Sequence, residues 1–350
     1  MAPLRFGIVG CGGIAGLHAR TFRDGLERDG TAQLIAGAET DPERREAFGT
    51  KWSLPMHDSL ESLLARDDID AVAITSPSGL HAAHAIQVVK SGRHALSEKP
   101  LDTSAERAAA AVAAAKEAGV VLGGIFQQRF NAGVQKVRRA VQAGAFGELV
   151  YVHCETPWYR AQSYYDSGAW RGTWDLDGGV LSNQGVHMVD RLLWLAGDWD
   201  EVLHSVCSLG KFRNIEAETL GVATVRLKNG AIATITGTTL AYDGLAQRVL
   251  ICGTNGSAAF HGEELVTFKT REPFEEMKEA TENASRTTDT DNKAADPLAL
   301  SSNQHEANYR DFIAVVREGK ESLIKPEEGV RVVALLNAIY AAAGAGPYTG

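Results

Sequence analysis

The sequence predicts an α/β protein of two domains: a parallel sheet covered by helices on both faces, followed by an α+β domain with a large, mostly antiparallel open sheet. The chain has 350 residues, which is more than one hydrophobic core usually supports. Short apolar runs alternate with helical patterns up to residue 125, whereas apolar runs follow one another closely after residue 148. The first pattern is typical of parallel strands joined by helices, and the second of hairpins.

The first domain, predicted over 1–125, has five apolar runs that we expect to be strands of a doubly wound parallel sheet. Helical patterns separate them. The helix predicted over 103–118 has Thr103 and Glu106 at the spacing of a capping box and Gly119 at its end. The predicted strands are 5–9, 33–38, 69–75, 93–97 and 120–126.

The second domain, predicted over 126–350, begins with closely spaced strands. Asn229-Gly230 and Asn255-Gly256 separate neighbouring runs and favour hairpins. Residues 272–296 hold eight acidic and three basic side chains, which predicts a mobile acidic insertion. The strands predicted here are 149–155, 219–228, 231–241 and 248–253; amphipathic helices are predicted over 304–318 and 327–343, and we expect the second to pack on the first domain.

Composition and charge narrow the class of protein. A net charge of −9 argues against nucleic acid or an anionic membrane as partner, because either needs a basic face. No apolar run reaches the ~18 residues that span a bilayer. The N-terminus lacks a signal-peptide layout, so we expect a cytoplasmic protein. The four cysteines show no CxxC spacing, and we expect neither a disulfide framework nor a metal site.

A glycine-rich turn follows the first predicted strand and opens a helix. Gly10 permits the tight turn, Gly12 lets the backbone approach a pyrophosphate, and Ala15 lets the helix pack close to the strand. The helix N-terminus then offers N–H groups and partial positive charge to phosphates. The pattern therefore predicts a Rossmann-type sheet that binds a dinucleotide. The residues predicted to contact it here are Gly10, Gly12, Gly13, Ile14 and Ala15.

The second predicted strand runs into Glu39, Thr40 and Asp41. A carboxylate at this place can accept hydrogen bonds from the ribose hydroxyls of adenosine. It would also repel a 2′-phosphate, because like charges ~4 Å apart repel by up to a few kcal/mol at an effective dielectric constant of ~20. We therefore expect NAD rather than NADP, with Glu39 and Thr40 at the cofactor. A solvated acid, with Asp41 capping the next helix, is the alternative.

Two more motifs complete a family pattern: Thr75-Ser76-Pro77-Ser78-x-x-His81, and Glu98-Lys99-Pro100 after the predicted strand 93–97. With the glycine-rich turn, they make the chain resemble the glucose–fructose oxidoreductase and inositol dehydrogenase family (Gfo/Idh/MocA) over essentially its whole length. The resemblance implies that the Lys99 ammonium hydrogen-bonds the reacting substrate oxygen beside the nicotinamide, and that Pro100 fixes the turn. A solvated surface turn is the alternative for this motif. Cofactor contacts are expected from Ser76, Pro77, His81, Glu98 and Lys99; structural roles are the alternative for His18 and His81.

Residues 177–190 resemble the family's glycine-rich stretch that leads into a helix. The i, i+4 spacing predicts Asn183 and His187 on one helical face. The resemblance implies that His187 is the general base for the substrate hydroxyl, a task that suits imidazole because its ordinary pKa is near neutrality. The chain departs from the family pattern at Asn183, where many relatives have Asp, and at Asp177, the first position of a glycine triplet. An amide can orient a hydroxyl but cannot take up its proton.

Residues 164–174, together with the Asn-Gln-Gly-x-His variant, are similar to the branch of the family that oxidises UDP-linked N-acetylglucosaminuronic acid at C3. Arg171 is a candidate contact to the cofactor or a ligand anion, and Trp170 a candidate for packing at the nicotinamide; an aromatic loop over the core is the alternative. Gln128 and Arg129 match a pocket-lining family segment and are candidates for sugar hydroxyls, although a structural Arg129 is equally open.

Taken together, the motifs predict an NAD-dependent dehydrogenase or reductase that transfers a hydride between the cofactor and a secondary alcohol or ketone of a sugar, sugar derivative or inositol. Lys99, His187 and Asn183 are the predicted catalytic residues, and Lys99, Gln128, Arg129, Asn183 and His187 the predicted substrate contacts. One alternative is a UDP-hexuronate-type 3-dehydrogenase that holds NAD tightly, and a lesser one a non-catalytic nucleotide-sensing regulator. Relatives often pair through the outer face of the antiparallel sheet, so we expect a homodimer or homotetramer.

Overall fold

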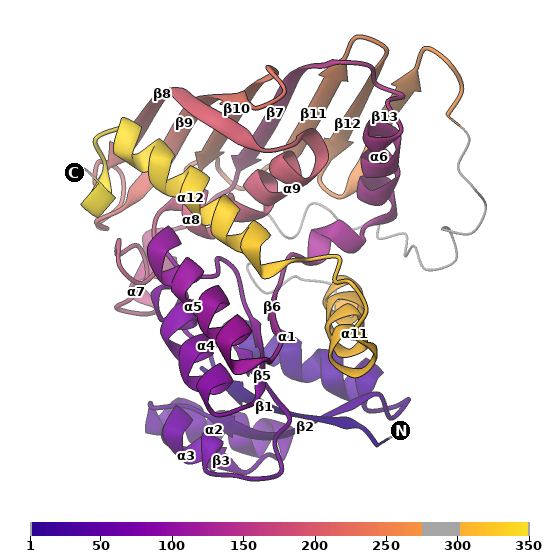
Figure 1. Ribbon diagram of the computed structural model, residues 1–350. Coiled ribbons are helices and arrows are strands. Elements are labelled where there is room, and N and C mark those ends of the chain that lie inside the picture. Colours follow the sequence, from indigo (N-terminus) through magenta and orange to yellow (C-terminus); the bar gives the residue numbers. More distant parts are fainter. Residues whose placement is uncertain (1, 275–301, 349–350) are drawn as a thin grey trace. The chain divides into compact units, whose positions relative to one another are not determined.

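The computed structural model describes residues 2–274 and 302–348 (Figure 1). The predicted acidic insertion at 272–296 therefore lies almost entirely outside the described residues. The chain divides into two compact units. The first comprises residues 1–127 and 300–333, and the second residues 128–299 and 334–350.

The first unit is built on a six-stranded sheet in which every neighbouring pair is parallel. The strand order β3-β2-β1-β4-β5-β6 is that of a doubly wound dinucleotide-binding sheet, as predicted. All five predicted strands are present, and only the two-residue β3 was not predicted, because two residues are too few to show a periodic pattern. The strands are β1 (Leu4–Val9), β2 (Ala32–Ala38), β3 (Met56–His57), β4 (Ala71–Ile74), β5 (His94–Ser97) and β6 (Leu122–Gly124).

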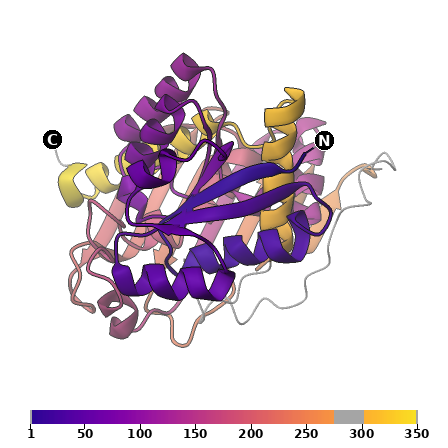
Figure 2. The same ribbon diagram turned by 90° about the horizontal axis from the view of Figure 1, so that it is seen from below.

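Helices cover both faces of this sheet (Figure 2), so its central strands are buried on both sides. One core contains Phe6, Phe22, Tyr309 and Phe312, and thus joins the sheet to α1 and α11. The other core packs the sheet against α3, α4 and α5. The helices are α1 (Gly13–Thr21), η1 (Phe22–Leu26), α2 (Pro42–Trp52), α3 (Leu60–Leu64), η2 (Ser78–Leu80), α4 (His81–Lys90), α5 (Ala105–Ala118) and α11 (Ser302–Glu318).

Helix α5 ends as predicted but begins differently. Gly119 follows it with a positive φ of 66°, the left-handed conformation of a glycine C-cap. Its N-cap is Ser104 and not Thr103: the Ser104 side chain accepts a hydrogen bond from the Arg107 backbone N–H. The Thr103 hydroxyl instead accepts from the Arg107 guanidinium. The predicted capping box was therefore wrong by one residue, because the Thr103 hydroxyl binds the Arg107 side chain and not the backbone of the first turn.

The second unit contains a seven-stranded sheet with the order β13-β12-β11-β7-β10-β9-β8. Only β7 and β10 pair in parallel, so the prediction of a mostly antiparallel sheet is confirmed. Asn229-Gly230 joins β9 to β10, and the turn at Asn255 joins β11 to β12, both as hairpins. The strands are β7 (Leu149–Pro157), β8 (Trp199–Leu209), β9 (Glu218–Leu227), β10 (Ile232–Thr238), β11 (Arg248–Gly253), β12 (Gly256–His261) and β13 (Glu264–Thr270).

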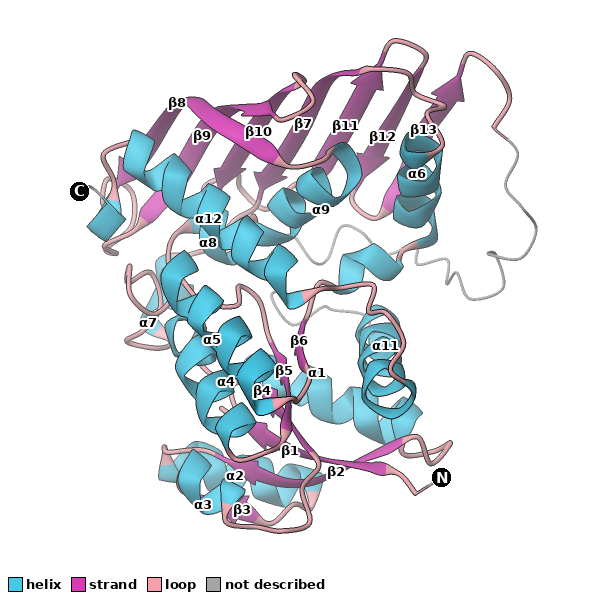
Figure 3. Cartoon of the chain, viewed as in Figure 1, coloured by secondary structure: helices cyan, strands magenta, loops and turns pink. Residues whose placement is uncertain are grey.

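Helices pack against one face of the second sheet (Figure 3). Its opposite face carries exposed apolar side chains, among them Val206 and the Val222 that pairs with it across β8 and β9. The helices of this part of the chain are η3 (Gln127–Phe130), α6 (Ala132–Gln142), α7 (Gln162–Asp166), α8 (Val180–Asn183), α9 (Val186–Ala196), α12 (Pro326–Ala342), which passes from the first unit into the second, and η5 (Gly346–Tyr348).

Helix α11 belongs to the first unit although it follows most of the second in the sequence. We expect its packing to contribute strongly to the stability of the first unit. Phe312 is 2% exposed and packs against Phe6, with ring centroids 6.1 Å apart. Replacing Phe312 by Ala should lower the free energy of unfolding by about 3 kcal/mol, because it removes a buried ring and leaves a cavity. Urea denaturation measures this loss. Phe212→Ala, at a side chain that is half exposed, is the matched control; an equal loss in both variants would contradict the packing role of α11.

Candidate functional site

The carboxyl ends of β1, β2, β4 and β5 bring together the residues predicted to bind the cofactor in the first unit. Gly10 follows β1 with a φ of +86°, and a Cβ on it would lie 2.5 Å from the Ser76 Cα. Only glycine therefore fits between these two loops. The Thr75 hydroxyl donates to the Gly10 carbonyl oxygen at 2.7 Å, which fixes the turn.

The start of α1 has the features of a phosphate cradle. Its N-cap is Gly12 in an extended conformation, and no side chain caps the first turn. A Cβ on Gly12 would meet nothing within 4 Å, so the backbone there opens onto space that a ligand can approach. Ala15 is fully buried against the sheet. These residues fit the pyrophosphate of a dinucleotide, whose charge the N–H groups of the first helical turn would stabilise.

The Glu39 carboxylate supports this turn from β2. Its Oε2 accepts a hydrogen bond from the Cys11 backbone N–H at 2.8 Å, and its Oε1 accepts one from the Asp41 N–H at 3.0 Å. Oε1 also accepts from the Thr40 hydroxyl at 3.4 Å. Each carboxylate oxygen has about two lone-pair sites, so Oε2 can still accept from a ribose hydroxyl. Asp41 caps α2 by accepting from the Arg44 N–H. Burial and the charge of Glu39 raise the pKa of the Cys11 thiol to about 12, which makes it a packing residue and not a nucleophile.

His81 joins the two loops that carry the family motifs. Its ring is 1% exposed, with Nε2 2.8 Å from the Ser76 carbonyl oxygen and Nδ1 2.6 Å from that of Pro100. The imidazole is thus engaged on both sides by backbone. This arrangement gives His81 the structural role that the sequence left open, since it fixes the Ser76 and Pro100 backbones relative to each other.

The Glu98-Lys99-Pro100 motif follows β5 directly, and the Lys99–Pro100 peptide bond is cis. Glu98 is not a solvated surface acid: it is 4% exposed and lies against His18 and His305. Its Oε2 accepts from the Lys99 backbone N–H at 3.0 Å. Glu98 therefore acts within the protein, on the backbone of the residue that the resemblance singles out.

In the second unit the prediction of one helix carrying Asn183 and His187 was wrong. Asn183 ends α8, whereas His187 is the second residue of α9. The Gly185 N–H donates to the Val180 carbonyl oxygen at 2.7 Å, five residues back, which closes a wide turn and ends the first helix. His187 is 8% exposed and Asn183 is half-buried.

Asn183 and Asp177, the two residues at which the chain departs from the family pattern, contact each other. The Asn183 amide nitrogen donates to Asp177 Oδ1, and its amide oxygen accepts from Gln184 at 3.2 Å. Asp177 is 1% exposed, and its Oδ2 accepts from the Gly172 N–H at 2.7 Å. A carboxylate is thus present beside position 183 although the residue there is an amide. Asp177 fixes the orientation of Asn183.

A second buried acid, Glu218, lies below the same glycine-rich stretch and was not predicted. Its Oε1 accepts from the Leu181 N–H and from the Tyr340 hydroxyl, both at 2.9 Å. A Cβ on Gly179 would overlap the other carboxylate oxygen, so this glycine makes room for Glu218. Burial raises the pKa of Glu218 to about 7, although these two hydrogen bonds act to lower it. No sequence signal marks it, since it is one acid before an apolar strand.

Arginine and aromatic side chains cluster around α7. The Arg171 guanidinium lies 4.2 Å from the centroid of the Tyr164 ring and 4.5 Å from that of Trp170, and it donates to the Tyr164 hydroxyl at 2.6 Å. Arg160 lies 5.3 Å from the same Tyr164 ring. Burial lowers the pKa of Arg160 and raises that of Tyr164. Two cations thus share one aromatic ring, an arrangement that favours an anionic ligand nearby.

The contacts of Arg129 are those of a structural residue, one of the two possibilities that the sequence left open. The guanidinium is 1% exposed, its Nε donates to Asp190 Oδ2 at 3.0 Å, and it lies over the Trp194 ring. Gln128 is half-buried in the short helix η3. Asp190, on α9, is a partner that sequence reasoning missed, because nothing in its spacing links it to Arg129.

Family models match both parts of the chain. The model described as "Oxidoreductase family, NAD-binding Rossmann fold" matches residues 4–126, and "GFO/IDH/MocA C-terminal domain" matches residues 134–259. The fold and the glycine cradle define an NAD-binding oxidoreductase. The chain belongs to the GFO/IDH/MocA oxidoreductase family.

Several relatives have known names. The structure of the WlbA dehydrogenase from Bordetella pertussis in complex with NADH and UDP-GlcNAcA is similar with a TM-score of 0.84 and 34% identity over 98% of this chain and 97% of that one. Inositol 2-dehydrogenase of Rhizobium meliloti is 24% identical over 76% of this chain and 78% of its own. A 1-carboxy-3-chloro-3,4-dihydroxycyclohexadiene dehydrogenase of Comamonas testosteroni is 29% identical, and the match spans 57% of its length and 67% of this chain.

No helix in the described part of the chain is both long and apolar enough to cross a membrane.

We predict that Glu218 makes the protein less stable as the pH rises. The folded state keeps this proton up to a pH of about 7, whereas the unfolded chain releases it near the ordinary pKa of 4.5. The folded state therefore binds more protons between these values, and its stability falls as the pH rises through them. Glu218→Gln removes this dependence, so its melting temperature relative to the parent should be higher at about pH 8 than at about pH 5.

Thermal denaturation at both pH values tests this prediction, with Glu201→Gln as the control at an exposed strand position. A difference between Glu218→Gln and the parent that does not change with pH would contradict the retained proton.

Proposed function

We propose that the protein oxidises a secondary alcohol of a nucleotide-linked sugar acid, as a UDP-hexuronate-type 3-dehydrogenase. The observation that carries this proposal is the similarity to the WlbA dehydrogenase bound to NADH and UDP-GlcNAcA, at 34% identity over nearly the full length of both chains. A free sugar, sugar derivative or inositol is the second candidate substrate, which the similarity to inositol 2-dehydrogenase favours.

The proposed chemistry assigns a separate task to each of three side chains, Lys99, Asn183 and His187. NAD, held at the glycine cradle, would supply the acceptor for the hydride that leaves the carbinol carbon. His187 takes the hydroxyl proton, so that the alcohol loses two electrons and two hydrogens and becomes a ketone. Lys99 donates a hydrogen bond to the reacting oxygen and stabilises the negative charge that develops on it. Asn183, held by Asp177, orients the hydroxyl but takes no proton.

The arginine–aromatic cluster supports an anionic substrate. A nucleotide-linked uronic acid carries a diphosphate and a carboxylate, both of which guanidinium groups bind through paired hydrogen bonds. Arg160 and Arg171 share the Tyr164 ring in the segment similar to the UDP-hexuronate branch. A neutral inositol would not need this concentration of positive charge. We therefore place Arg171, with Trp170, among the proposed ligand contacts.

Replacing Lys99 by Met or His187 by Ala should each lower kcat by roughly 10²-fold or more, because each removes a group that stabilises the transition state. Affinity for NADH should persist, since the glycine cradle is intact. NADH formation from UDP-GlcNAcA, UDP-GlcNAc, glucuronate and myo-inositol measures turnover and substrate class together. His204→Ala, at an exposed histidine, is the control. Near-parental turnover of Lys99→Met or His187→Ala would contradict the role proposed for that residue.

We also infer that the chain forms a homo-oligomer through the open face of its second sheet. Val206 is 56% exposed and Val222 41% exposed, and they are paired across neighbouring strands. A second copy would bury this apolar surface. Val222→Glu should therefore convert the assembly to smaller species in sedimentation velocity. Gln87→Glu, an exposed site on α4 with the same change of charge, is the control; a Val222→Glu protein of unchanged mass would contradict the interface.

A further inference from the structure

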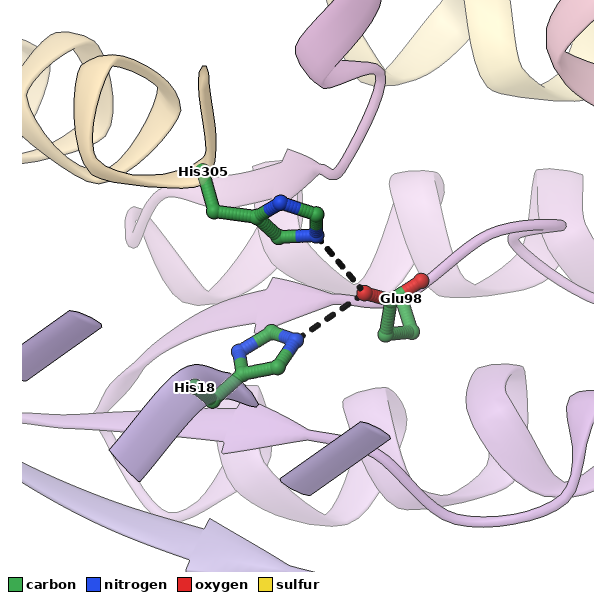
Figure 4. A group of neighbouring side chains, drawn as sticks. All are labelled: His18, Glu98 and His305. Atoms are coloured by element: carbon green, nitrogen blue, oxygen red, sulfur yellow. Dashed lines mark hydrogen bonds and ion pairs between the residues drawn. The ribbon is translucent and has the colours of Figure 1, made fainter. Parts of the chain in front are cut away.

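A buried polar cluster from three distant parts of the chain surrounds Glu98 (Figure 4). His18 comes from α1, whereas His305 and Tyr309 come from α11. The exposed fractions of His18, Glu98 and His305 are 0%, 4% and 2%. Both imidazoles point toward the same carboxylate oxygen of Glu98. Neither the cofactor cradle nor the proposed proton transfer uses this cluster directly.

His18 links Tyr309 to Glu98 through its two ring nitrogens. His18 Nε2 lies 2.9 Å from Glu98 Oε1, and His18 Nδ1 lies 2.7 Å from the Tyr309 hydroxyl. Burial and the charge of Glu98 raise the pKa of Tyr309 well above its usual value, so this hydroxyl keeps its proton. The two ring nitrogens of His18 thus bridge the Tyr309 hydroxyl and the Glu98 carboxylate. The proton of His18 Nε2 is the one that an ionised Glu98 can accept.

His305 adds a second favourable interaction on the same oxygen. Its Nε2 lies 3.7 Å from Glu98 Oε1, and its ring meets that of His18 edge to face, with centroids 5.6 Å apart. Burial lowers the pKa of His305, while Glu98 opposes this. Although burial works against ionisation, the interactions with His18 and His305 hold the pKa of Glu98 well below its usual range.

The other oxygen of the carboxylate connects the cluster to the site. Glu98 Oε2 accepts from the Lys99 backbone N–H at 3.0 Å, and the Glu98 N–H donates to the Ile74 carbonyl oxygen on β4 at 2.9 Å. Two residues on, the Pro100 carbonyl oxygen is held by His81. The backbone on either side of Lys99 is thus fixed by buried side chains.

We propose that His18 and His305 are positioning residues for Lys99. Through the Glu98 carboxylate they fix the backbone from which the Lys99 side chain extends, so that its ammonium is placed before the substrate arrives. This inference rests on the proposed role of Lys99 in the reaction. It also gives α11 a function: a helix from near the C-terminus completes the support of the residue that follows β5.

A bound metal is the competing explanation, because two histidines and a carboxylate are a ligand set for zinc. Their ligand atoms lie within 4.8 Å of one another. Tetrahedral ligands ~2.05 Å from zinc are ~3.3 Å apart, however, whereas His18 and Glu98 are 2.9 Å apart, a hydrogen-bond length. A dication would also face the Lys99 ammonium, which already interacts electrostatically with Glu98. Both observations favour a cluster held by hydrogen bonds and charge over a metal-binding site.

The test compares His305→Gln, which keeps an N–H donor, with His305→Phe, which fills similar space without one. We expect kcat to fall at least ~10-fold in His305→Phe and less in His305→Gln, with the Kd of NADH unchanged, because a misplaced catalytic group loses rate rather than cofactor affinity. Equal losses in both variants, or a loss of NADH affinity alone, would overturn the proposal. His94→Phe, at the opposite end of β5, is the matched control.

A double-mutant cycle separates this inference from the proposed function. If His305 acts through Lys99, His305→Phe should lower kcat little further when Lys99 is already Met. Additive losses would overturn the positioning role. If Lys99→Met alone keeps its turnover, the proposed function fails. If Lys99→Met is impaired but His305→Phe is not, only the positioning role fails.

Hydrogen exchange gives a readout that does not depend on activity. The Lys99 amide should exchange faster in His18→Leu and His305→Phe than in the parent, while amides of β10 in the second unit should not change. Unchanged protection of Lys99 would contradict the inference. Should His305→Phe not fold, His18→Leu, which lacks a donor, and His18→Gln, which keeps one, supply the same comparison. Elemental analysis of the purified parent should find no stoichiometric metal; about one zinc per chain, lost in His305→Gln, would replace the proposal with a metal site.

Discussion

An ionised carboxylate buried in the first unit links the fold to the candidate site. Removing such a charge from water costs several kcal/mol unless hydrogen bonds and opposite charges compensate for it. Glu98 receives this compensation from α1, from α11 and from the backbone of Lys99. The burial of this ionised carboxylate therefore depends on both helices packing at the end of β5. The stability of this unit and the geometry of its site are consequences of the same contacts.

The two buried acids of the second unit, Asp177 and Glu218, differ in their surroundings. Asp177 accepts hydrogen bonds from Gly172 and Asn183, and it orients the amide at the position where many relatives have a carboxylate. Glu218 accepts from Leu181 and Tyr340, yet burial raises its pKa to about 7. Asp177 is the first residue of the short glycine-rich stretch that leads to His187, and Glu218 lies against it. This stretch is thus shaped by two buried acids as much as by its own glycines.

Much of the first unit was predictable because its signals are local. Five of its six strands, the turn at Gly10 and the C-cap Gly119 depend on neighbouring residues alone. The failures arise where one local contact replaces another that the sequence favours. Ser104 caps α5 because the Thr103 hydroxyl accepts from the Arg107 side chain, and Asn183 and His187 lie on separate helices because of the wide turn at Gly185. Strands such as β12 were missed because short, weakly apolar runs give no clear period.

The sequence by itself determined the glycine cradle for a dinucleotide, and its resemblance to a family singled out the lysine after β5 and the histidine beyond the second glycine-rich stretch as candidates for the chemistry. Spacing along the chain encodes the cradle because it depends on a turn and a helix start. Only the tertiary structure decided which residues support them. His305 meets Glu98, Tyr309 meets His18, Asp190 meets Arg129, and Glu218 fills the space below Gly179. A buried charge is stabilised by whatever donors the fold brings near it, and that proximity has no counterpart in sequence spacing.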